Sequence, residues 1–149
     1  MAIDRSYVGK EYPTTPPYQV SREHIRDFAA AIGDLNPAHH NVDAAHELGH
    51  PDLIAPPTYP FTLTMRAMTT AILDPDLGLE YGQVVHGEQY FDYVRPIAAG
   101  DELVVRARID SIVSKGINEL LTTACLVETV TGELVVTTRE VIVSRGTAV

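Results

Sequence analysis

The sequence predicts an α+β fold in which an antiparallel sheet follows one buried helix. Between residues 58 and 73 the chain is apolar on nearly every side of a helical pattern, and Arg66 is its only charged residue. From residue 84 onward, segments rich in β-branched and aromatic residues alternate with short turns such as Thr131-Gly132-Glu133. A run of helices followed by strands that short turns connect is typical of α+β domains.

Composition limits the kind of protein this can be. The chain has 149 residues, of which 45% are hydrophobic and 21% charged, so we expect residues 1–149 to form a single folded domain. Its net charge of −9 disfavours nucleic acid and anionic membranes as partners. No apolar run reaches the roughly 18 residues of a membrane span, the N-terminus lacks a signal-peptide core, and Cys125 is the only cysteine. These features predict a cytoplasmic protein with no membrane partner.

The first helix is expected over residues 22–32. Ser21 fits its N-cap, Glu23 lies in the first turn where the helix dipole favours an anion, and Gly33 ends it. Apolar residues recur there with helical spacing and form one face: Ile25, Phe28, Ala29 and Ile32. The proline-rich stretch before this helix is expected to be extended, with a tail that could pair as an edge strand.

The second helix is expected to begin after Pro56-Pro57, with Thr58 as its cap and Pro60 in its first turn. Its apolar residues surround the axis, and one face combines Phe61, Met65, Met68 and Ile72. A helix that is apolar nearly all round is buried on most sides, so this segment is the expected centre of the fold.

Four strands are expected in the second half of the chain. Residues 84–95 and 119–130 are rich in β-formers, residues 103–110 alternate between apolar and polar, and residues 134–144 follow the last turn. A sheet of such strands curling around the central helix is the hot-dog arrangement. A long edge strand left bare is an aggregation hazard, so we expect two such sheets to pair in a dimer.

Residues 33–50 contain two patterns with catalytic potential, GDLNPAHH and HELGH. The second spells H-E-x-x-H, in which His46 and His50 would bind zinc from one face of a helix. The glycine and proline on either side of His50 stop any helix there, and residues 59–73, where a downstream ligand would lie, contain no acid. A zinc peptidase is therefore a distant third interpretation. We expect no metal, and the two histidines should be exposed positions on a short helix.

The first pattern places a carboxylate, an amide and an imidazole on one turn: Asp34, Asn36 and His39. Any turn that ends a helix favours Gly, Asp, Asn and Pro, so composition alone does not make it a site. The order of residues is more specific. FAAAIGDLNPAHHN, followed by LIAPPTYPF and YVRPIAAGDEL, resembles the signature of the MaoC-like hot-dog hydratase and dehydratase family, which includes (R)-specific enoyl-CoA hydratases. The matching residues are Phe28, Gly33, Asp34, Asn36, Pro37 and His39, then Tyr93, Pro96, Ile97, Gly100, Asp101 and Leu103.

The resemblance extends over residues 7–145 and looks like the single-domain actinobacterial branch, which is related to dehydratases of type I fatty-acid synthases and of mycolic-acid elongation. It implies an enzyme of fatty-acid metabolism that hydrates 2-enoyl thioesters, or dehydrates (R)-3-hydroxyacyl thioesters, without a metal or other cofactor. CoA or acyl carrier protein would carry the acyl group. The active unit would be a homodimer, or a heterodimer with another hot-dog subunit.

The implied chemistry explains the residue types. Moving one proton at Cα and one at the oxygen on Cβ requires two proton carriers that flank one water. Asp34 and His39 would be these carriers, in either assignment of acid and base, and Asn36 would hold the turn or orient the imidazole. The acyl chain would lie along the second helix, and the residues expected to bind substrate are Pro57, Thr58, Phe61, Met65, Met68 and His86.

The developing enolate also needs a hydrogen-bond donor, usually a main-chain N–H at the start of the central helix. Many hydratases have His-Gly there, but this chain has Ala55-Pro56-Pro57-Thr58, and proline has no N–H. The donor must then be Thr58 or come from a shifted register. This departure supports an alternative function, a non-catalytic subunit that binds acyl thioesters and pairs with an active hot-dog dehydratase.

Overall fold

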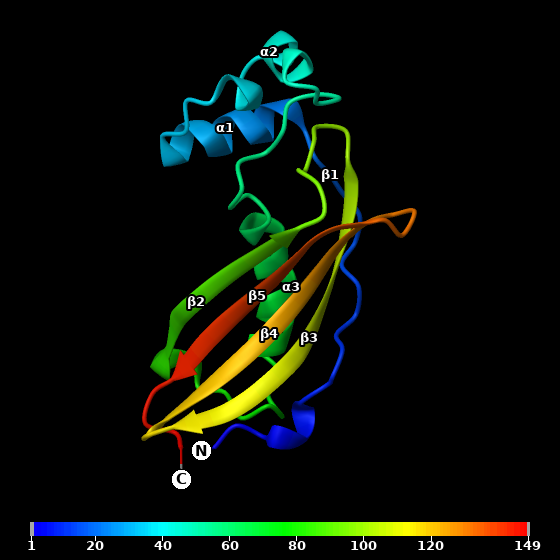
Figure 1. Ribbon diagram of the computed structural model, residues 1–149. Coiled ribbons are helices and arrows are strands. Elements are labelled where there is room, and N and C mark those ends of the chain that lie inside the picture. The colour runs from blue at the N-terminus through cyan, green and yellow to red at the C-terminus, as the bar shows by residue number, and fades with distance from the viewer. Residues whose placement is uncertain (1, 149) are drawn as a thin grey trace.

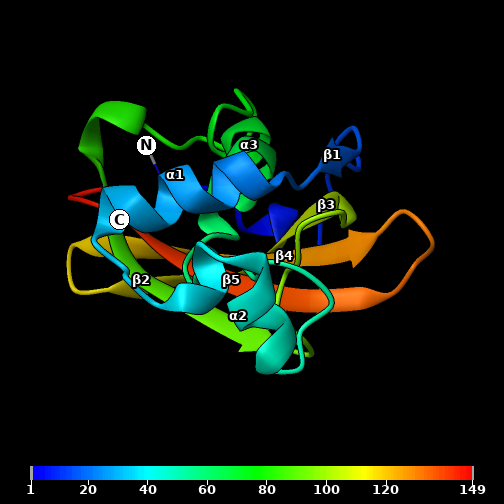
Figure 2. The same cartoon turned by 90° about the horizontal axis from the view of Figure 1, so that it is seen from above.

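The sheet has five strands, paired antiparallel in the order β1-β3-β4-β5-β2. The computed structural model describes residues 2–148 (Figure 1). The strands are β1 (Tyr18–Gln19), β2 (Val84–Tyr93), β3 (Glu102–Lys115), β4 (Asn118–Thr129) and β5 (Leu134–Ser144). Helix α3 (Phe61–Ile72) lies on one face of this sheet (Figure 2), which confirms the expected α+β hot-dog arrangement.

Alternation along the strands decides which side chains meet α3. On β3 the apolar residues that the sequence predicts to be buried are buried: Leu103, Val105, Ala107 and Ile109. The arginines between them point to the opposite face of the sheet. The strand runs on to Lys115, past residue 110, because a bulge after Ile109 shifts the register without ending the pairing with β4. On β4, Cys125 is fully buried in the core, and burial raises the pKa of its thiol.

Helix α3 begins later than the sequence predicts. Residues 57–60 form a turn in which Tyr59 N–H donates to Pro56 O and Phe61 N–H donates to Thr58 O. Pro60 occupies the N-cap position, and no side chain caps the helix. Thr58 therefore lies before the helix and is not its cap.

Burial of α3 is one-sided. Ala67 and Ala71 are buried on the side of the sheet, whereas Met65 is 53% exposed and Leu73 is 60% exposed. The expectation of burial on most sides is wrong for this chain alone, because the sheet covers only one side of the helix. The open flank of α3 faces a cavity that β2 also lines, so the exposed apolar surface lies along the edge of the sheet.

Helix α1 (Arg22–Ile32) has the predicted bounds. The Ser21 side chain accepts a hydrogen bond from His24 N–H at 3.1 Å, and Gly33 ends the helix with a φ of 73°. Ile32, in the last turn of the helix, was expected on the buried face but is 52% exposed, whereas Ile25 and Ala29 are buried. A 3-10 helix, η2 (Pro37–His39), and helix α2 (Val42–Glu47) follow, and they lie with α1 at the end of the sheet where α3 begins (Figure 1).

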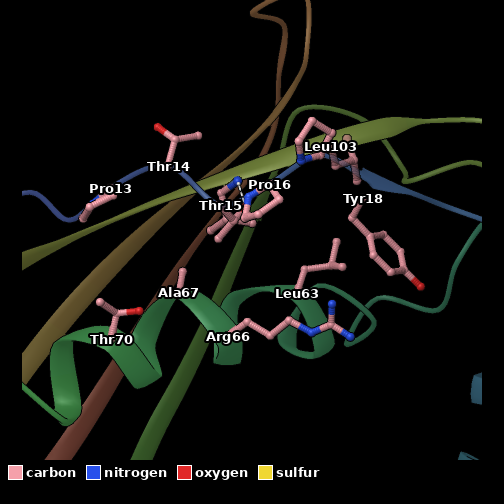
Figure 3. Close-up of a pocket in the computed structure, with 12 residues that line it drawn as sticks. Pro13, Thr14, Thr15, Pro16, Tyr18, Leu63, Arg66, Ala67, Thr70 and Leu103 are labelled. Carbon is pink, nitrogen blue, oxygen red and sulfur yellow. Dashed lines mark hydrogen bonds between the residues drawn. The ribbon is translucent and has the colours of Figure 1, made fainter.

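The proline-rich stretch before α1 is extended, as expected, and runs beside β3. A main-chain hydrogen bond joins Tyr12 N to Ala107 O, and β1 pairs with the start of β3. Between this stretch and α3 lies a cleft of about 340 Å³ (Figure 3). Arg66 reaches from α3 toward β1, where its guanidinium lies 5.6 Å from the centre of the Tyr18 ring. None of the residues expected to bind substrate lines this cleft.

Two other 3-10 helices, η1 (Arg5–Tyr7) and η3 (Tyr81–Gln83), lie before β1 and before β2. Neither contains a buried residue, so both lie at the surface.

Among the helices of residues 2–148, none has the length and apolar character needed to cross a bilayer.

Candidate active site

The end of α1 and the turn after it bring a carboxylate against an imidazole. Gly33 ends the helix, Asp34 follows, and η2 carries His39 back toward Asp34. Asp34 Oδ2 lies 3.2 Å from His39 Nε2. His39 is only 3% exposed, whereas the Asp34 side chain is partly open to solvent. The structure thus brings together the two residues that were expected to carry protons.

The other ring nitrogen of His39 is fixed by the main chain. His39 Nδ1 lies 2.6 Å from the carbonyl oxygen of Ile54, and because a carbonyl only accepts, Nδ1 carries a proton and donates it. With Nδ1 held by the main chain, Nε2 is the ring nitrogen that faces Asp34 Oδ2. The two groups that were expected to move protons therefore meet through these two atoms.

Asn36 and His40 hold the turn that carries this pair. Asn36 Oδ1 accepts from Ala38 N–H at 3.1 Å, and Asn36 N–H donates to Asp34 Oδ1 at 3.0 Å. These bonds let Asn36 hold the turn. The imidazole of His39 is oriented by the Ile54 carbonyl and not by Asn36. His40 Nε2 donates to the main-chain oxygen of Asp34 at 2.7 Å, a support that the sequence does not reveal.

The Asp34–His39 pair opens into a cavity of about 320 Å³. The cavity is lined by Asp34, Asn36, His39, Ile54, Ala55, Pro57, Tyr93 and Pro96. The Tyr93 hydroxyl donates to the carbonyl oxygen of Pro57 at 2.8 Å, and burial raises the pKa of this hydroxyl. The end of β2 is thereby tied to the turn before α3.

Two more cavities continue from this site along α3. One has a volume of about 460 Å³ and the other about 480 Å³, and Phe61 and His86 line both. The two rings lie 5.5 Å apart, centroid to centroid. The six residues expected to bind substrate all line one or more of the three cavities: Pro57, Thr58, Phe61, Met65, Met68 and His86. Apolar walls with a few polar groups at one end suit a long acyl chain whose polar head lies at that end.

The turn before α3 leaves one main-chain donor free. Tyr59 N–H donates to Pro56 O at 2.9 Å, and the prolines have no N–H. Within residues 2–148, Thr58 N–H has no hydrogen-bond acceptor. Thr58 is exposed and lines the cavity of about 460 Å³. Its neighbour Pro57 lines the cavity of about 320 Å³ that holds Asp34 and His39. A free N–H at the start of a helix can stabilise a developing oxyanion.

The H-E-x-x-H histidines do not share a helix face. Helix α2 ends at Glu47, so His46 lies in its last turn and His50 lies beyond it. His46 Nε2 is 3.1 Å from the carbonyl oxygen of Pro51. Within residues 2–148, no three His, Cys, Asp or Glu side chains gather as a metal site would require.

We expect chelators to leave the protein unchanged. His46 and His50 lack the shared helix face that would let both imidazoles reach one zinc ion. Elemental analysis should find no stoichiometric zinc, and EDTA should leave the melting temperature where it is. One zinc per chain, lost in His46→Ala, would contradict this prediction and support a peptidase.

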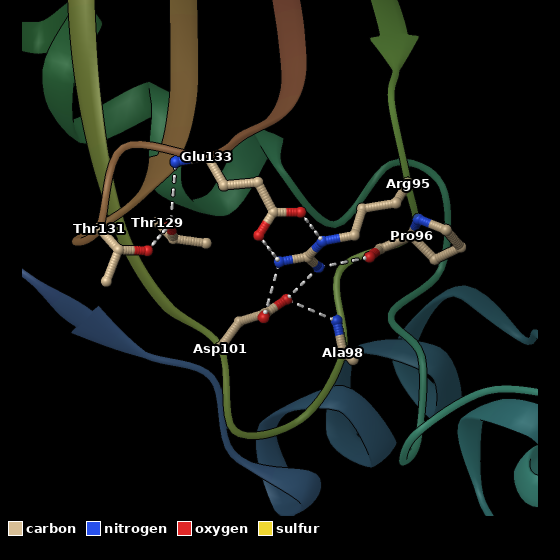
Figure 4. A network of polar contacts seen from close by, with 7 residues as sticks. All are labelled: Arg95, Pro96, Ala98, Asp101, Thr129, Thr131 and Glu133. Carbon is tan, nitrogen blue, oxygen red and sulfur yellow. Dashed lines mark hydrogen bonds and ion pairs between the residues drawn. The ribbon is translucent and has the colours of Figure 1, made fainter.

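An ion-pair network fixes the loop that follows β2 (Figure 4). Arg95 donates hydrogen bonds to Asp101 at 2.8 and 3.0 Å and to Glu133 at 2.7 Å. These bonds raise the pKa of Arg95, and Arg95 lowers that of Glu133. Asp101 also accepts a hydrogen bond from Ala98 N–H at 2.9 Å, which closes this loop. The loop places Pro96 in the wall of the cavity that holds Asp34 and His39. Nothing in the sequence marks the pairing with Glu133.

Comparisons with sequences agree on one family. The family model described as "FAS1-like, dehydratase domain region" matches residues 6–138. A UPF0336 protein of Streptomyces griseus is 50% identical over 146 residues, which cover 98% of this chain and 97% of that protein. A UPF0336 protein of Saccharopolyspora erythraea is 47% identical over 148 residues, which cover 99% of this chain and 95% of that protein.

Solved structures share the fold. The truncated HadBC (3R-hydroxyacyl-ACP dehydratase) complex from Mycobacterium tuberculosis matches with a TM-score of 0.83 and 29% identity, over 92% of this chain and 96% of that chain. A MaoC-like dehydratase matches with a TM-score of 0.88 and 31% identity, over 94% of this chain and 42% of that longer chain. The R-hydratase PhaJ1 from Pseudomonas aeruginosa matches with a TM-score of 0.69 over 93% of this chain and 81% of that chain, and at 22% identity it shows the fold alone.

Proposed function

Because the chain belongs to the family of FAS1-like dehydratase domain regions, we propose that it is a hydro-lyase that interconverts 2-enoyl and (R)-3-hydroxyacyl thioesters of CoA or acyl carrier protein. The expected resemblance to MaoC-like hot-dog proteins is confirmed by the family model and the shared fold. The observation that carries the proposal is the 3.2 Å contact between Asp34 Oδ2 and His39 Nε2 in the wall of a largely apolar cavity.

A carboxyl group and an imidazole side by side can perform both proton transfers of hydration. One group takes a proton from a water held against both of them while the water oxygen forms its bond to Cβ. The π electrons of the double bond move to an enolate on the thioester oxygen, and Thr58 N–H donates a hydrogen bond to that oxygen. Cα then takes a proton from the other group. One proton is accepted and one is given, so the proton count of the pair is unchanged. Transfer of a proton from the first group to the second restores the starting state, and dehydration follows the same steps in reverse.

The acyl chain lies, in this proposal, along the open flank of α3. Phe61, Met65 and Met68 form an apolar wall, and methionine adapts to chains of different shape. The His86 ring lies beside that of Phe61, tilted by 35°, at the far wall. The thioester lies at the start of the helix, within reach of Thr58 N–H, so the CoA or carrier arm leaves from the side of the Asp34–His39 pair.

The direct test is hydration of crotonyl-CoA and of longer 2-enoyl-CoAs by the purified protein, with loss of the conjugated double bond as the readout. We expect kcat/KM to rise with the length of the acyl chain, because a longer chain covers more of the apolar wall. No turnover on any chain length, with the protein folded and paired, would reject it.

A second candidate function is a non-catalytic subunit that binds acyl thioesters and pairs with an active hot-dog dehydratase. Pro56-Pro57 favours it, because these residues remove two main-chain donors from the start of α3. The two functions differ in a mixing experiment. A catalytic chain hydrates 2-enoyl thioesters by itself. A binding subunit instead raises the hydration rate of its partner, and it still does so when its His39 is replaced.

We expect the protein to be a homodimer, or a heterodimer with another hot-dog subunit, paired along β2. Within residues 2–148 this ten-residue strand pairs only with β5, and apolar side chains such as Val85 and Tyr90 are exposed on it. Light scattering at micromolar concentration should give twice the chain mass of 16.3 kDa. A monomer would contradict the homodimer, and failure of every hot-dog partner from the same source to bind would contradict the heterodimer as well.

A further inference from the structure

Three polar rings meet between α1, β1 and the turn before α3, and the proposed reaction uses none of them. His24 Nδ1 lies 2.6 Å from the Tyr18 hydroxyl and 2.7 Å from the Tyr59 hydroxyl. Tyr59 is 0% exposed, and Phe28 packs against its ring with centroids 5.4 Å apart. Burial raises the pKa of the Tyr59 hydroxyl, so it remains a neutral donor that needs an acceptor in the core. A ring nitrogen makes one hydrogen bond in the plane of the ring, so the two hydroxyls share His24 Nδ1 and the three groups form one hydrogen-bonded cluster.

The turn before α3 has few other hydrogen bonds to the rest of the fold. No side chain caps the helix, and the main-chain bonds of Tyr59 N and Phe61 N stay within the turn itself. Among the side-chain hydrogen bonds of residues 2–148, two tie this turn to other parts of the fold. Tyr93 on β2 donates to the Pro57 carbonyl, and Tyr59 reaches His24 on α1.

The second of these ties joins the two halves of the proposed site. His24 is in α1, whose C-terminal end leads directly into Asp34. Tyr59 follows Thr58, whose N–H is free. The His24–Tyr59 contact therefore links the helix that leads into the proton-carrying pair to the turn that carries the oxyanion donor. His24 lines none of the cavities along α3, so it acts through Tyr59 and does not touch the substrate.

We propose that His24 is a positioning residue, which holds Tyr59 and thereby places Thr58 N–H against the thioester oxygen. This inference rests on the proposed function. A donor displaced by about 1 Å can cost on the order of 100-fold in rate, so loss of the bond should lower kcat much more than it changes KM.

The test compares two replacements of His24. His24→Phe keeps a ring but removes the ring nitrogen that both hydroxyls contact. We expect kcat on a 2-enoyl-CoA to fall by at least about tenfold, as a small displacement of the donor would cause, with KM within about threefold. His24→Asn places an amide oxygen near the position of Nδ1 and should restore most of kcat. Tyr59→Phe removes only the partner hydroxyl and should match His24→Phe, and the double variant should lose no more than either. His46→Phe and His46→Asn, on the exposed end of α2, are the matched controls.

A second readout does not depend on turnover. The amide resonance of Thr58 in a ¹H–¹⁵N spectrum should shift in His24→Phe and in Tyr59→Phe, and should return toward its original position in His24→Asn. If the original protein is inactive on every enoyl-CoA while the Thr58 amide responds, the proposed function fails and the positioning stands. A folded His24→Phe or Tyr59→Phe protein with unchanged kcat and an unmoved Thr58 amide would overturn the inference. A His24→Asn protein as impaired as His24→Phe would also overturn it.

Discussion

Replacing either member of the proton-carrying pair should abolish hydration in a protein that still folds. We expect Asp34→Asn and His39→Ala each to lower kcat by about 10³-fold, within the range seen when a positioned acid or base is lost. Asp34→Asn keeps the shape of the side chain but cannot take a proton. His39→Ala also leaves the Ile54 carbonyl without its donor, so its melting temperature should fall as well. Initial rates and thermal melts measured on the same preparations separate the two effects.

The double variant carries a further expectation. Because the two groups act on one water, the loss in the double variant should barely exceed the larger single loss. Asp43→Asn and His46→Ala make the same chemical changes on the exposed surface of α2 and should leave the rate unchanged. Near-normal rates in either Asp34→Asn or His39→Ala would refute the assignment of the pair.

The second large effect is expected at Thr58. Thr58→Pro removes the one free N–H of the turn and should lower kcat by 100-fold or more, since loss of an oxyanion donor costs roughly 3 kcal/mol. KM should change little, because the donor acts mainly on the charge that develops during the reaction. Steady-state kinetics on one 2-enoyl-CoA give both values.

Thr58→Ala is the matched control, because it removes the hydroxyl and keeps the N–H. Its rate should stay within a few-fold of the original, and a large loss would instead assign the donor to the hydroxyl. A substrate-bound structure whose thioester oxygen points away from Thr58 would refute this placement even if the Asp34–His39 pair were upheld.

The parts of the fold that could be predicted are those that local chemistry determines. Helix α1 begins at Arg22 and ends at Ile32 because Ser21 caps it and Gly33 takes a left-handed conformation, and both signals lie in adjacent residues. Strand alternation identified the buried face of β3 for the same reason. The order of residues around Asp34 indicated the candidate pair, and the structure places its two members in contact.

The parts that could not be predicted depend on contacts between distant segments. The carbonyl of Ile54 that orients His39 belongs to the main chain, and every residue has one, so no residue type identifies it. The exposure of Met65 was missed because an apolar face looks the same in a sequence whether its own sheet or another chain covers it. His24 and Tyr59 are separated by 35 positions, and their contact exists only because the fold brings α1 beside the turn before α3.

Cys125 makes opening of the core measurable without an engineered probe. It is the only thiol of the chain, it is fully buried in the core, and burial raises its pKa, so an alkylating reagent reacts with it only in molecules whose core has opened. The rate of alkylation under native conditions thus reports how often that opening occurs. A subunit bound along β2, or an acyl ligand bound beside α3, stabilises the closed form and should protect the thiol in proportion to its occupancy. Protection of this one sulfur atom would therefore rank enoyl thioesters by affinity even in variants that no longer turn them over.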